Sequence, residues 1–331
     1  MHTRFATAVF VALLGSAGLG AADNILVAST RSNSIEQFSA SGTWLRTFAT
    51  TGPYQPNFLA QSPVTGEIFV TVLGPSGSSM VPYNTILRYQ ANGQFDTNWD
   101  TFALDTSSCT CTAGTQSLLF DASGNLYVAT HFGLDTGEPI AIFKFLAASL
   151  TANNPPAEPD PIIASMTRGD QMAFNTSGNL CIAGFIDEDV KCFDTTTGAL
   201  TQDYYAEIHA SSVYGIEPGG LAFDAHNRMY LTSIFTGQVV KELKPGGPIV
   251  LLATLAPPPN SLNGNLWLRG ANLYVPSYYF SPPTVSTPDA VYEVNVSTGA
   301  TTNFIVGIAA PGLGNAHLWG ANCVIFYNPT L

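Results

Sequence analysis

The stretch CVIFYNPTL (residues 323–331) ends the chain, and it has the pattern of one β-strand followed by the beginning of a turn. No partner strand follows it. Near the other end, NILVAST (24–30) has the pattern of a second strand whose first strand is missing. Each stretch supplies what the other lacks, so we expect the two to pair and to join the ends of the chain.

One phrase recurs between these ends: a short apolar strand, a polar turn with Gly or Asn, and a second apolar strand. It occurs as SLLFDASGNLYVAT (117–130), QMAFNTSGNLCIAG (171–184), GLAFDAHNRMYLTS (220–233) and, more loosely, FLAQSPVTGEIFVTV (58–72) and LWLRGANLYVPS (266–277). A third and a fourth strand often follow, as in AVYEVNVSTGA (290–300) and TTNFIVG (301–307). Four antiparallel strands joined by tight turns are typical of a propeller blade.

The spacing of the phrase predicts the number of blades. Equivalent positions near the end of each first strand are Gln61, Phe120, Phe174, Phe223, Trp267 and Phe326, which lie 44 to 59 residues apart. Counting from Phe326 across the joined ends back to Gln61 completes a unit of similar length. A β-sandwich also contains alternating strands, but half a blade at each end is expected only for a circular array. The sequence therefore predicts an all-β, six-bladed β-propeller of four-stranded antiparallel blades, whose ring is closed by the C-terminal strand joining the N-terminal blade.

The first 22 residues have a basic residue, an apolar core and a stretch of small residues, which is the layout of a secretory signal peptide. We expect cleavage before Asp23 and a single propeller domain over residues 23–331. The alternative is a short membrane anchor, but Gly15, Gly18 and Gly20 interrupt the apolar run. We therefore expect a secreted protein, extracellular or periplasmic, that does not insert into a membrane.

The formal net charge is −12, with only 11 Lys and Arg residues, so the surface should repel phosphate groups. Nucleic acid and anionic membranes are therefore excluded as expected partners. Charged residues make up 10% of the chain, yet 46% of residues are hydrophobic, which excludes disorder. Because a closed ring leaves no sheet edge to template association, we expect a monomer.

Five cysteines leave at least one unpaired. Cys181 and Cys192 are register partners across one predicted hairpin, and either a disulfide or two thiols fits that position. Cys109 and Cys111 lie in a loop, as two thiols or one tight disulfide, without the further ligands that a metal would need. Cys323 is expected to behave as a small buried hydrophobe.

The first strand of each blade lines the channel of a propeller, so polar residues there are candidate ligands. The positions four residues before each repeat position are Asn57, Gln116, Asp170, Gly219, Asn263 and Asn322. Amide and carboxylate oxygens that converge on an axis favour a hard cation, most simply Ca²⁺, with Glu217 reaching in for Gly219. The alternative is a narrow channel whose amides bind ordered water.

The phrase PGGLAFDAHNRMYLTS (218–233) resembles NHL-type repeats and the wider six-bladed group that includes the gluconolactonase/senescence-marker family, paraoxonases and strictosidine-synthase-like proteins. The resemblance extends over the mature chain at the level of blades. It implies a divalent metal at the channel mouth with Asn, Asp and Glu ligands, and hydrolysis of lactones. The ring in this chain departs from that pattern, because it contains no Glu and one blade contributes Gly219.

Three residues are candidates for catalysis. Asp170 suits a base or a metal ligand, and His317 and His131 lie on loops predicted to face the channel mouth, where a histidine could transfer protons. The alternative is that both are ordinary loop histidines. No G-x-S-x-G, H-E-x-x-H or Gly-rich phosphate loop is present, which argues against covalent serine catalysis and nucleotide binding.

Two hypotheses for the function follow. The favoured one is a secreted, noncatalytic propeller that binds a small molecule or a protein partner at its channel mouth. The alternative is a Ca²⁺-dependent hydrolase of lactones or related esters.

Overall fold

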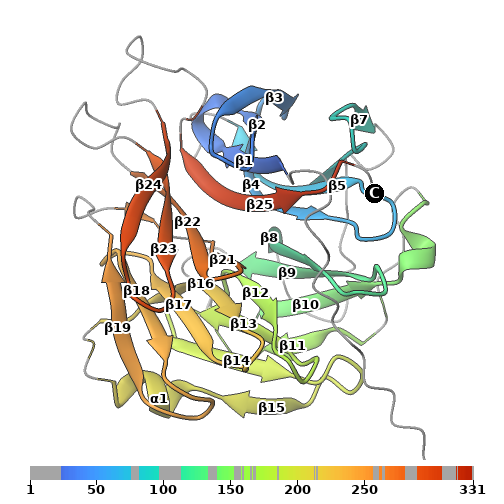
Figure 1. The fold of residues 1–331 in the computed structure, drawn as a ribbon. Coiled ribbons are helices and arrows are strands. Elements are labelled where there is room, and N and C mark those ends of the chain that lie inside the picture. The colour runs from blue at the N-terminus through green and yellow to red at the C-terminus, as the bar shows by residue number, and fades with distance from the viewer. Residues whose placement is uncertain are drawn as a thin grey trace, which may run out of the picture.

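A computed structural model describes the residues of this chain in the following ranges: 24–75, 82–96, 113–132, 140–152, 158, 160–164, 166, 169–184, 186–211, 213, 215–255, 261–262, 265–279, 289–307, 318 and 320–329. These residues form six antiparallel sheets arranged around a common centre (Figure 1). The all-β, six-bladed propeller predicted from the sequence is confirmed.

The blades are numbered in chain order, and each begins with the strand nearest the channel. They consist of the following strands: blade 1, β25 (Ala321–Tyr327), β1 (Asn24–Ser29), β2 (Ser34–Phe38) and β3 (Trp44–Thr50); blade 2, β4 (Tyr54–Gln61), β5 (Ile68–Pro75), β6 (Pro82–Tyr89) and β7 (Phe95–Asp96); blade 3, β8 (Ala113–Phe120), β9 (Leu126–Phe132), β10 (Ile140–Phe145) and β11 (Ile162–Ala164); blade 4, β12 (Met172–Phe174), β13 (Leu180–Gly184), β14 (Asp189–Phe193) and β15 (Leu200–Asp203); blade 5, β16 (Pro218–Phe223), β17 (Met229–Ser233), β18 (Gln238–Glu242) and β19 (Ile249–Thr254); blade 6, β20 (Ser261–Leu262), β21 (Trp267–Arg269), β22 (Asn272–Tyr279), β23 (Ala290–Asn295) and β24 (Thr301–Val306).

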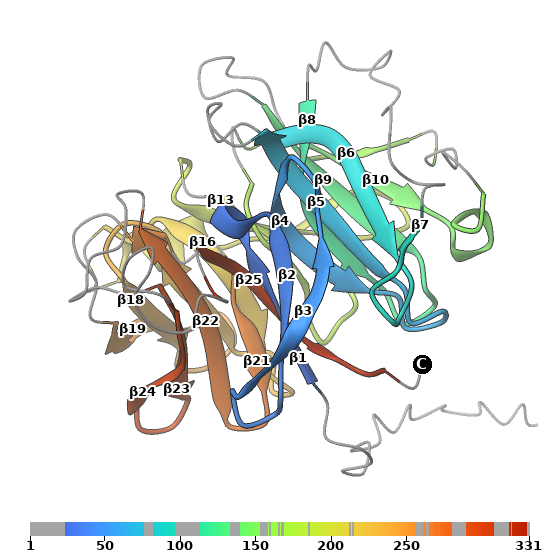
Figure 2. The ribbon, with the colours of Figure 1, turned by 90° about the horizontal axis from the view of Figure 1, so that it is seen from above.

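The ring closes through blade 1, which combines both ends of the described chain. β25 pairs with β1 in antiparallel register, with Phe326 opposite Ile25 and Val324 opposite Val27. In Figure 1 the red strand β25 accordingly lies beside the blue strand β1, and the view from above in Figure 2 agrees. The predicted pairing of CVIFY with NILVAS is confirmed.

A shared turn explains why the same phrase recurs between first and second strands. In blades 3, 4 and 5 the first turn residue is Asp or Asn, and its Oδ1 accepts the backbone N–H groups two and four residues later. The acceptors and their donors are Asp121 (Ser123 and Asn125, 2.9 Å each), Asn175 (Ser177 and Asn179, 3.0 Å each) and Asp224 (His226 and Arg228, 2.9 Å each). The fourth turn residue has positive φ, which suits the Gly of two blades and is tolerated by Asn227 in the third.

Six hydrophobic clusters fill the spaces between neighbouring blades, one at each interface. In the cluster between blades 1 and 2, for example, two rings of blade 1, Phe48 and Tyr327, meet edge to face with centroids 5.5 Å apart. Between blades 6 and 1, Tyr274 and Phe326 do the same at 4.8 Å. The core of this protein is therefore a circle of interfaces, and every blade depends on both neighbours.

The described cysteines resolve two sequence expectations. Cys181 and Cys192 are direct register partners on β13 and β14 and form a disulfide. Cys323 is free and fully buried in β25, and burial raises its pKa to about 12, so it behaves as the small hydrophobe that was predicted. Cys109 and Cys111 lie outside the described residues.

Two local features differ from the sequence expectations. A five-residue helix, α1 (Tyr205–His209), follows β15, and short 3₁₀ turns occur at η1 (Thr30–Ser32) and η4 (Ala147–Ser149).

In blade 6 the repeat position is shifted by one residue. Leu268, rather than Trp267, lies opposite the first core residue of the second strand, Leu273, because this hairpin has a two-residue turn. The turn in the other copies of the phrase is longer, so counting residues from the second strand with that longer turn places the repeat position one residue too early in blade 6.

Among the described residues, no helix has the length and the apolar character needed to cross a membrane. The expected signal peptide, residues 1–22, lies outside the described part of the chain and stays a prediction.

Removal of residues 321–331 should abolish cooperative folding. The deletion removes three buried side chains, Val324, Ile325 and Tyr327. Burial of each such side chain stabilises the folded state by about 1.5–3 kcal/mol. Their sum is comparable with the whole free energy of unfolding of a typical domain, about 5–15 kcal/mol. Thermal unfolding followed by circular dichroism checks this, with a chain lacking only residues 330–331 as the control. An unchanged melting temperature would show that the ring does not need β25.

Candidate functional site

The polar residues predicted to line the channel lie at β-bulges in the first strands. Two residues of the first strand oppose one residue of the second at Asn322, Gln116 and Gly219, and the register shifts by the same amount at Asn57. In blade 4, Asp170 donates its N–H to the Ala183 carbonyl, while the next residue accepts from the Ala183 N–H. Because a bulge re-aims the side chain of its extra residue, this shared irregularity brings the predicted ring together.

Four of the predicted ligands form a directional chain of hydrogen bonds through blades 1 to 4. The side-chain amide of Asn322 donates to Oδ1 of Asn57, whose own amide donates to Oε1 of Gln116 at 3.3 Å. Gln116 in turn donates to Oδ1 of Asp170 at 3.0 Å. An ionised carboxylate can only accept hydrogen bonds, so Asp170 is the natural end of a chain in which each amide donates to the next group. All four side chains are buried.

The residue after Asp170, Gln171, continues the circuit through blades 4, 5 and 6. Its Oε1 accepts the N–H of Leu221 at 2.8 Å and that of Leu266 at 2.7 Å, and its Nε2 donates to the Leu266 carbonyl at 2.8 Å. The buried side chain of Gln171 therefore hydrogen-bonds with backbone groups of blades 5 and 6, as a neighbouring strand would. Sequence analysis missed this role, because only the neighbouring polar residue, Asp170, occupied a repeat-derived position.

Asn265 returns the circuit to blade 1. It is buried, and its Oδ1 accepts the N–H of Val324 in β25 at 3.2 Å. Gly220 permits the close approach of blades 5 and 6, since a Cβ there would lie 2.9 Å from the Cβ of Leu266. Backbone and side-chain polar groups therefore connect all six blades around the channel.

The remaining predicted site residues are placed as follows. His131 lies in β9, with its backbone opposite Gly114, and not on the loop that was predicted for it, because β9 extends to Phe132. The side chain of His131 and the whole of Asn263 and His317 are outside the described residues. Glu217 precedes β16 and lines a cavity on the mouth face, and no described contact joins it to the amide chain. The one-residue shift in blade 6 also moves the derived position from Asn263 to Gly264, which is outside the described residues too.

The mouth face carries a cavity of about 330 Å³ between the turn before β14 and the segment that leads into β16. Glu188, from the turn before β14, and Glu217, from the segment before β16, both line it, and His209 lies at the C-terminal end of α1. Nε2 of His209 is 3.8 Å from Oε2 of Glu188. Ile208, Val213 and Ile216 supply an apolar lining. Glu188 and His209 were not singled out from the sequence, because the cavity forms between two blades.

The electrostatics of this region favour the arrival of a positive charge. Burial, followed by the charge of Glu188, raises the pKa of Glu217 above its ordinary value. Beside the cavity, burial of Asp189, and then the charge of Asp203, raise the pKa of Asp189 from 3.8 to about 6, although Lys191 opposes the shift. Two carboxylates that face one cavity repel each other, and a bound cation removes that repulsion.

Within the described part of the chain, no group of three or more His, Cys, Asp or Glu residues is arranged to hold a metal ion. The amide ring is a different kind of donor set, with one carboxylate and three carboxamides. Amide and carboxylate oxygens are the type that Ca²⁺ takes, and each amide oxygen keeps a second lone pair after accepting one hydrogen bond. The ring as a metal site stays a prediction.

No protein-family model matches this sequence, and no curated protein is similar to it in sequence. Solved structures do share its fold. A chain of a nidogen/laminin complex matches with a TM-score of 0.57 and 13% identity over 84% of this chain and 91% of that chain. A streptogramin B lyase matches with a TM-score of 0.53 and 12% identity over 86% and 80%. The extracellular domain of a putative hybrid two-component system from B. thetaiotaomicron matches at 0.55 and 14%, over 95% of this chain and 39% of that chain.

Identities this low show a shared propeller fold and no more. The resemblance to gluconolactonase-like and strictosidine-synthase-like proteins therefore stays a prediction.

Replacing Gln171 by Leu should lower the free energy of unfolding by about 3 kcal/mol or more. The change leaves three buried backbone groups of Leu221 and Leu266 without their partner, at about 1–3 kcal/mol each. Urea unfolding measures the difference. The same substitution at the exposed Gln94 is the control and should change stability by less than about 0.5 kcal/mol. Equal effects at the two sites would contradict the proposed role of Gln171.

Asp189 should make stability fall as the pH rises from about 4 to about 6. Its pKa is raised in the folded protein, so the folded state binds this proton more tightly than the unfolded state does. Asp189→Asn removes the titration, and the variant should gain stability relative to the parent across that window. Denaturant unfolding at several pH values measures the trend. Asp194→Asn should show the opposite trend at lower pH, because hydrogen bonds from Thr197 lower the pKa of Asp194. A parent-to-variant difference independent of pH would refute the assignment for Asp189.

Proposed function

We propose that this protein is a noncatalytic, extracellular or periplasmic binding propeller that takes a cationic ligand in the cavity on its mouth face. The convergence of Glu188 and Glu217 on a cavity of about 330 Å³ carries the proposal. The cationic group is an amine or a guanidinium, on a small molecule or on a side chain of a protein partner.

The lining suits such a group. Carboxylates accept charge-assisted hydrogen bonds, and a guanidinium can engage a carboxylate through two parallel N–H groups. Ile208, Val213 and Ile216 would pack against the aliphatic part of the ligand. The formal net charge of −12 adds a long-range attraction for cations and disfavours nucleic acid and anionic membranes.

The hydrogen-bonded channel supports binding indirectly. Because Gln171 and the amide chain join neighbouring blades, the loops on the mouth face stand on a scaffold with little freedom to move. A preorganised site loses less entropy when the ligand arrives.

The disulfide between Cys181 and Cys192 supports an oxidising compartment, in line with the signal peptide proposed for residues 1–22. The propellers of similar fold include one described as an extracellular domain. Secretion of this chain, its monomeric state and the nature of the partner are parts of the proposal.

Isothermal titration with butylguanidine tests the cavity, with butanol as the uncharged counterpart. The parent should bind butylguanidine and not butanol, and Glu188→Gln with Glu217→Gln should weaken binding at least about tenfold, equivalent to ~1.4 kcal/mol. Glu67→Gln with Glu158→Gln removes the same total charge at residues that do not line this cavity and is the matched control. Equal weakening in both double variants would mean that only the overall charge matters, and absence of butylguanidine binding would overturn the proposal.

A second candidate function is Ca²⁺-dependent hydrolysis of lactones or related esters. The observation that favours it is the convergence of Asn57, Gln116 and Asn322 with the carboxylate of Asp170 at the channel. Ca²⁺ held there, with Asn263 and Glu217 as further proposed ligands, would supply a Lewis acid. Asp170, His131 and His317 would be the candidates for moving protons.

Metal analysis of the purified protein separates the two candidates. Bound Ca²⁺ that is lost in Asp170→Asn, together with a lower melting temperature in a chelator, would support the hydrolase and justify assays with lactones. A metal-free protein whose melting temperature ignores the chelator would eliminate it. The butylguanidine titration is repeated in the chelator, because Glu217 is the one described residue that the mouth cavity shares with the proposed metal ligands.

A further inference from the structure

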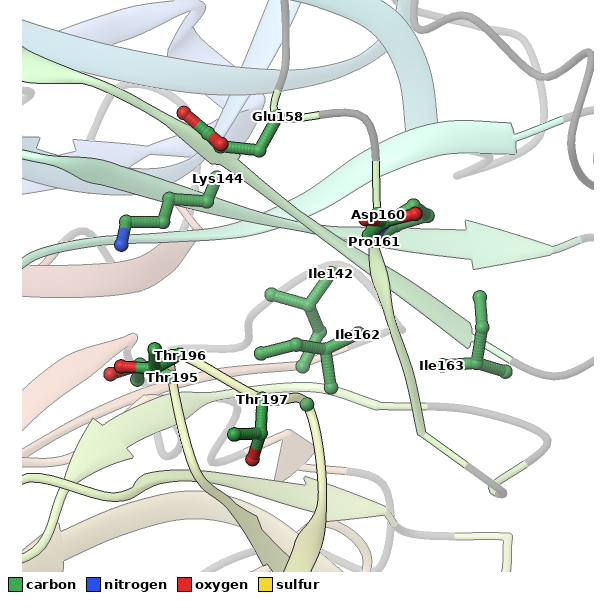
Figure 3. Close-up of a pocket in the computed structure, with 11 residues that line it drawn as sticks. Ile142, Lys144, Glu158, Asp160, Pro161, Ile162, Ile163, Thr195, Thr196 and Thr197 are labelled. Carbon is green, nitrogen blue, oxygen red and sulfur yellow. The ribbon is translucent and has the colours of Figure 1, made fainter.

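A second cavity, of about 520 Å³, lies on the face opposite the mouth, in the outer part of the groove between blades 3 and 4 (Figure 3). One wall is the end of β10 with the segment that leads into β11, which carry Lys144, Glu158 and Asp160. The other wall is the turn between β14 and β15, with Thr195–Thr197. In Figure 3 the side chains of Ile142 and Ile162 lie between the two walls.

The walls are held in place by contacts that leave polar groups facing the cavity. Lys144 lies over the ring of Tyr127, with Nζ 5.7 Å from the centroid. The hydroxyl of Thr197 donates to Asp194 within its own turn at 2.9 Å. On the other wall the backbone N–H of Glu158 donates to the Lys144 carbonyl at 2.7 Å. Within the described part of the chain, the carboxylates of Glu158 and Asp160 have no ion-pair partner.

The mixture of donors and acceptors distinguishes this cavity from the one at the mouth. Acceptors would dominate a site for a cation, and the ammonium of Lys144 would repel the ligand. A hydroxyl group, in contrast, both donates and accepts, so it can donate to a carboxylate and accept from an ammonium or a threonine. A ligand with several hydroxyl groups matches all of these side chains at once.

The apolar part of the lining fits the same ligand. Ile142, Pro161 and Ile162 form an aliphatic surface, which can pack against the C–H face of a sugar ring. The volume falls within the range of small-molecule sites and accommodates one or two sugar units. We propose that this groove between blades 3 and 4 is a saccharide-binding site, with Lys144 and Thr196 as hydrogen-bonding residues on opposite walls.

Titration with maltose, cellobiose, lactose and N,N′-diacetylchitobiose tests the assignment. At least one of the four disaccharides should bind with a Kd in the millimolar range or below, and Lys144→Met with Thr196→Val should weaken it at least about tenfold, equivalent to ~1.4 kcal/mol. Both substitutions keep the length or shape of the side chain while removing its polar group. The same pair of changes outside the cavity, Lys244→Met with Thr301→Val, is the matched control and should leave binding unchanged.

The variant Lys144→Met also distinguishes a saccharide from a cationic ligand, because the substitution should change their affinities in opposite directions. A saccharide loses a hydrogen-bond donor and binds more weakly, whereas a cation loses a repulsive neighbour and binds more tightly. Tighter binding of butylguanidine to Lys144→Met, with retention of that gain when Glu188→Gln and Glu217→Gln are added, would overturn the saccharide assignment. Failure of all four disaccharides to bind the parent protein would also overturn it, and would leave the separate cavity at the mouth untouched.

Discussion

The antiparallel pairing of β25 with β1 is the constraint on which the other contacts depend. Six wedge-shaped interfaces must be satisfied simultaneously, and the last of them forms only when the two ends of the chain share one blade. The same strand supplies Asn322 to the amide chain and the N–H of Val324 to Asn265. Because β25 takes part in both, its pairing with β1 completes the sheet of blade 1 and also the ring of hydrogen bonds around the channel.

The circuit also determines where ligands can bind. In the channel, the polar groups of one blade satisfy those of the next, with Gln171 bridging three blades. Side chains that satisfy each other stabilise the ring and contribute less to recognition. The two cavities instead lie between neighbouring blades, where carboxylates such as those of Glu158, Asp160 and Glu217 line open space. Both proposed binding sites therefore lie between blades, away from the hydrogen-bonded residues of the channel.

The two cavities illustrate how similar residue types produce different chemistry. Each contains two carboxylates, but at the mouth the companions are an apolar lining and His209, while in the outer groove they are Lys144 and the threonines of a turn. The first combination favours a positive charge, and the second favours a group that donates and accepts hydrogen bonds. Composition alone, with its net charge of −12, does not distinguish them.

The sequence by itself determined the number of blades, their strand order and the closure by the chain ends, because the blades repeat a local pattern of apolar alternation, which three of them combine with a turn capped by Asp or Asn. The position of Cys181 opposite Cys192 followed from the same local register, whereas the sequence left open whether the two form a disulfide. Only the tertiary structure decided the role of Gln171, whose partners belong to two other blades, and the meeting of Glu188 with Glu217 in one cavity. These contacts join residues that are distant along the chain and belong to different repeats. No local pattern encodes such distances, which depend on bulges, turn lengths and the angle at which each blade packs against the next.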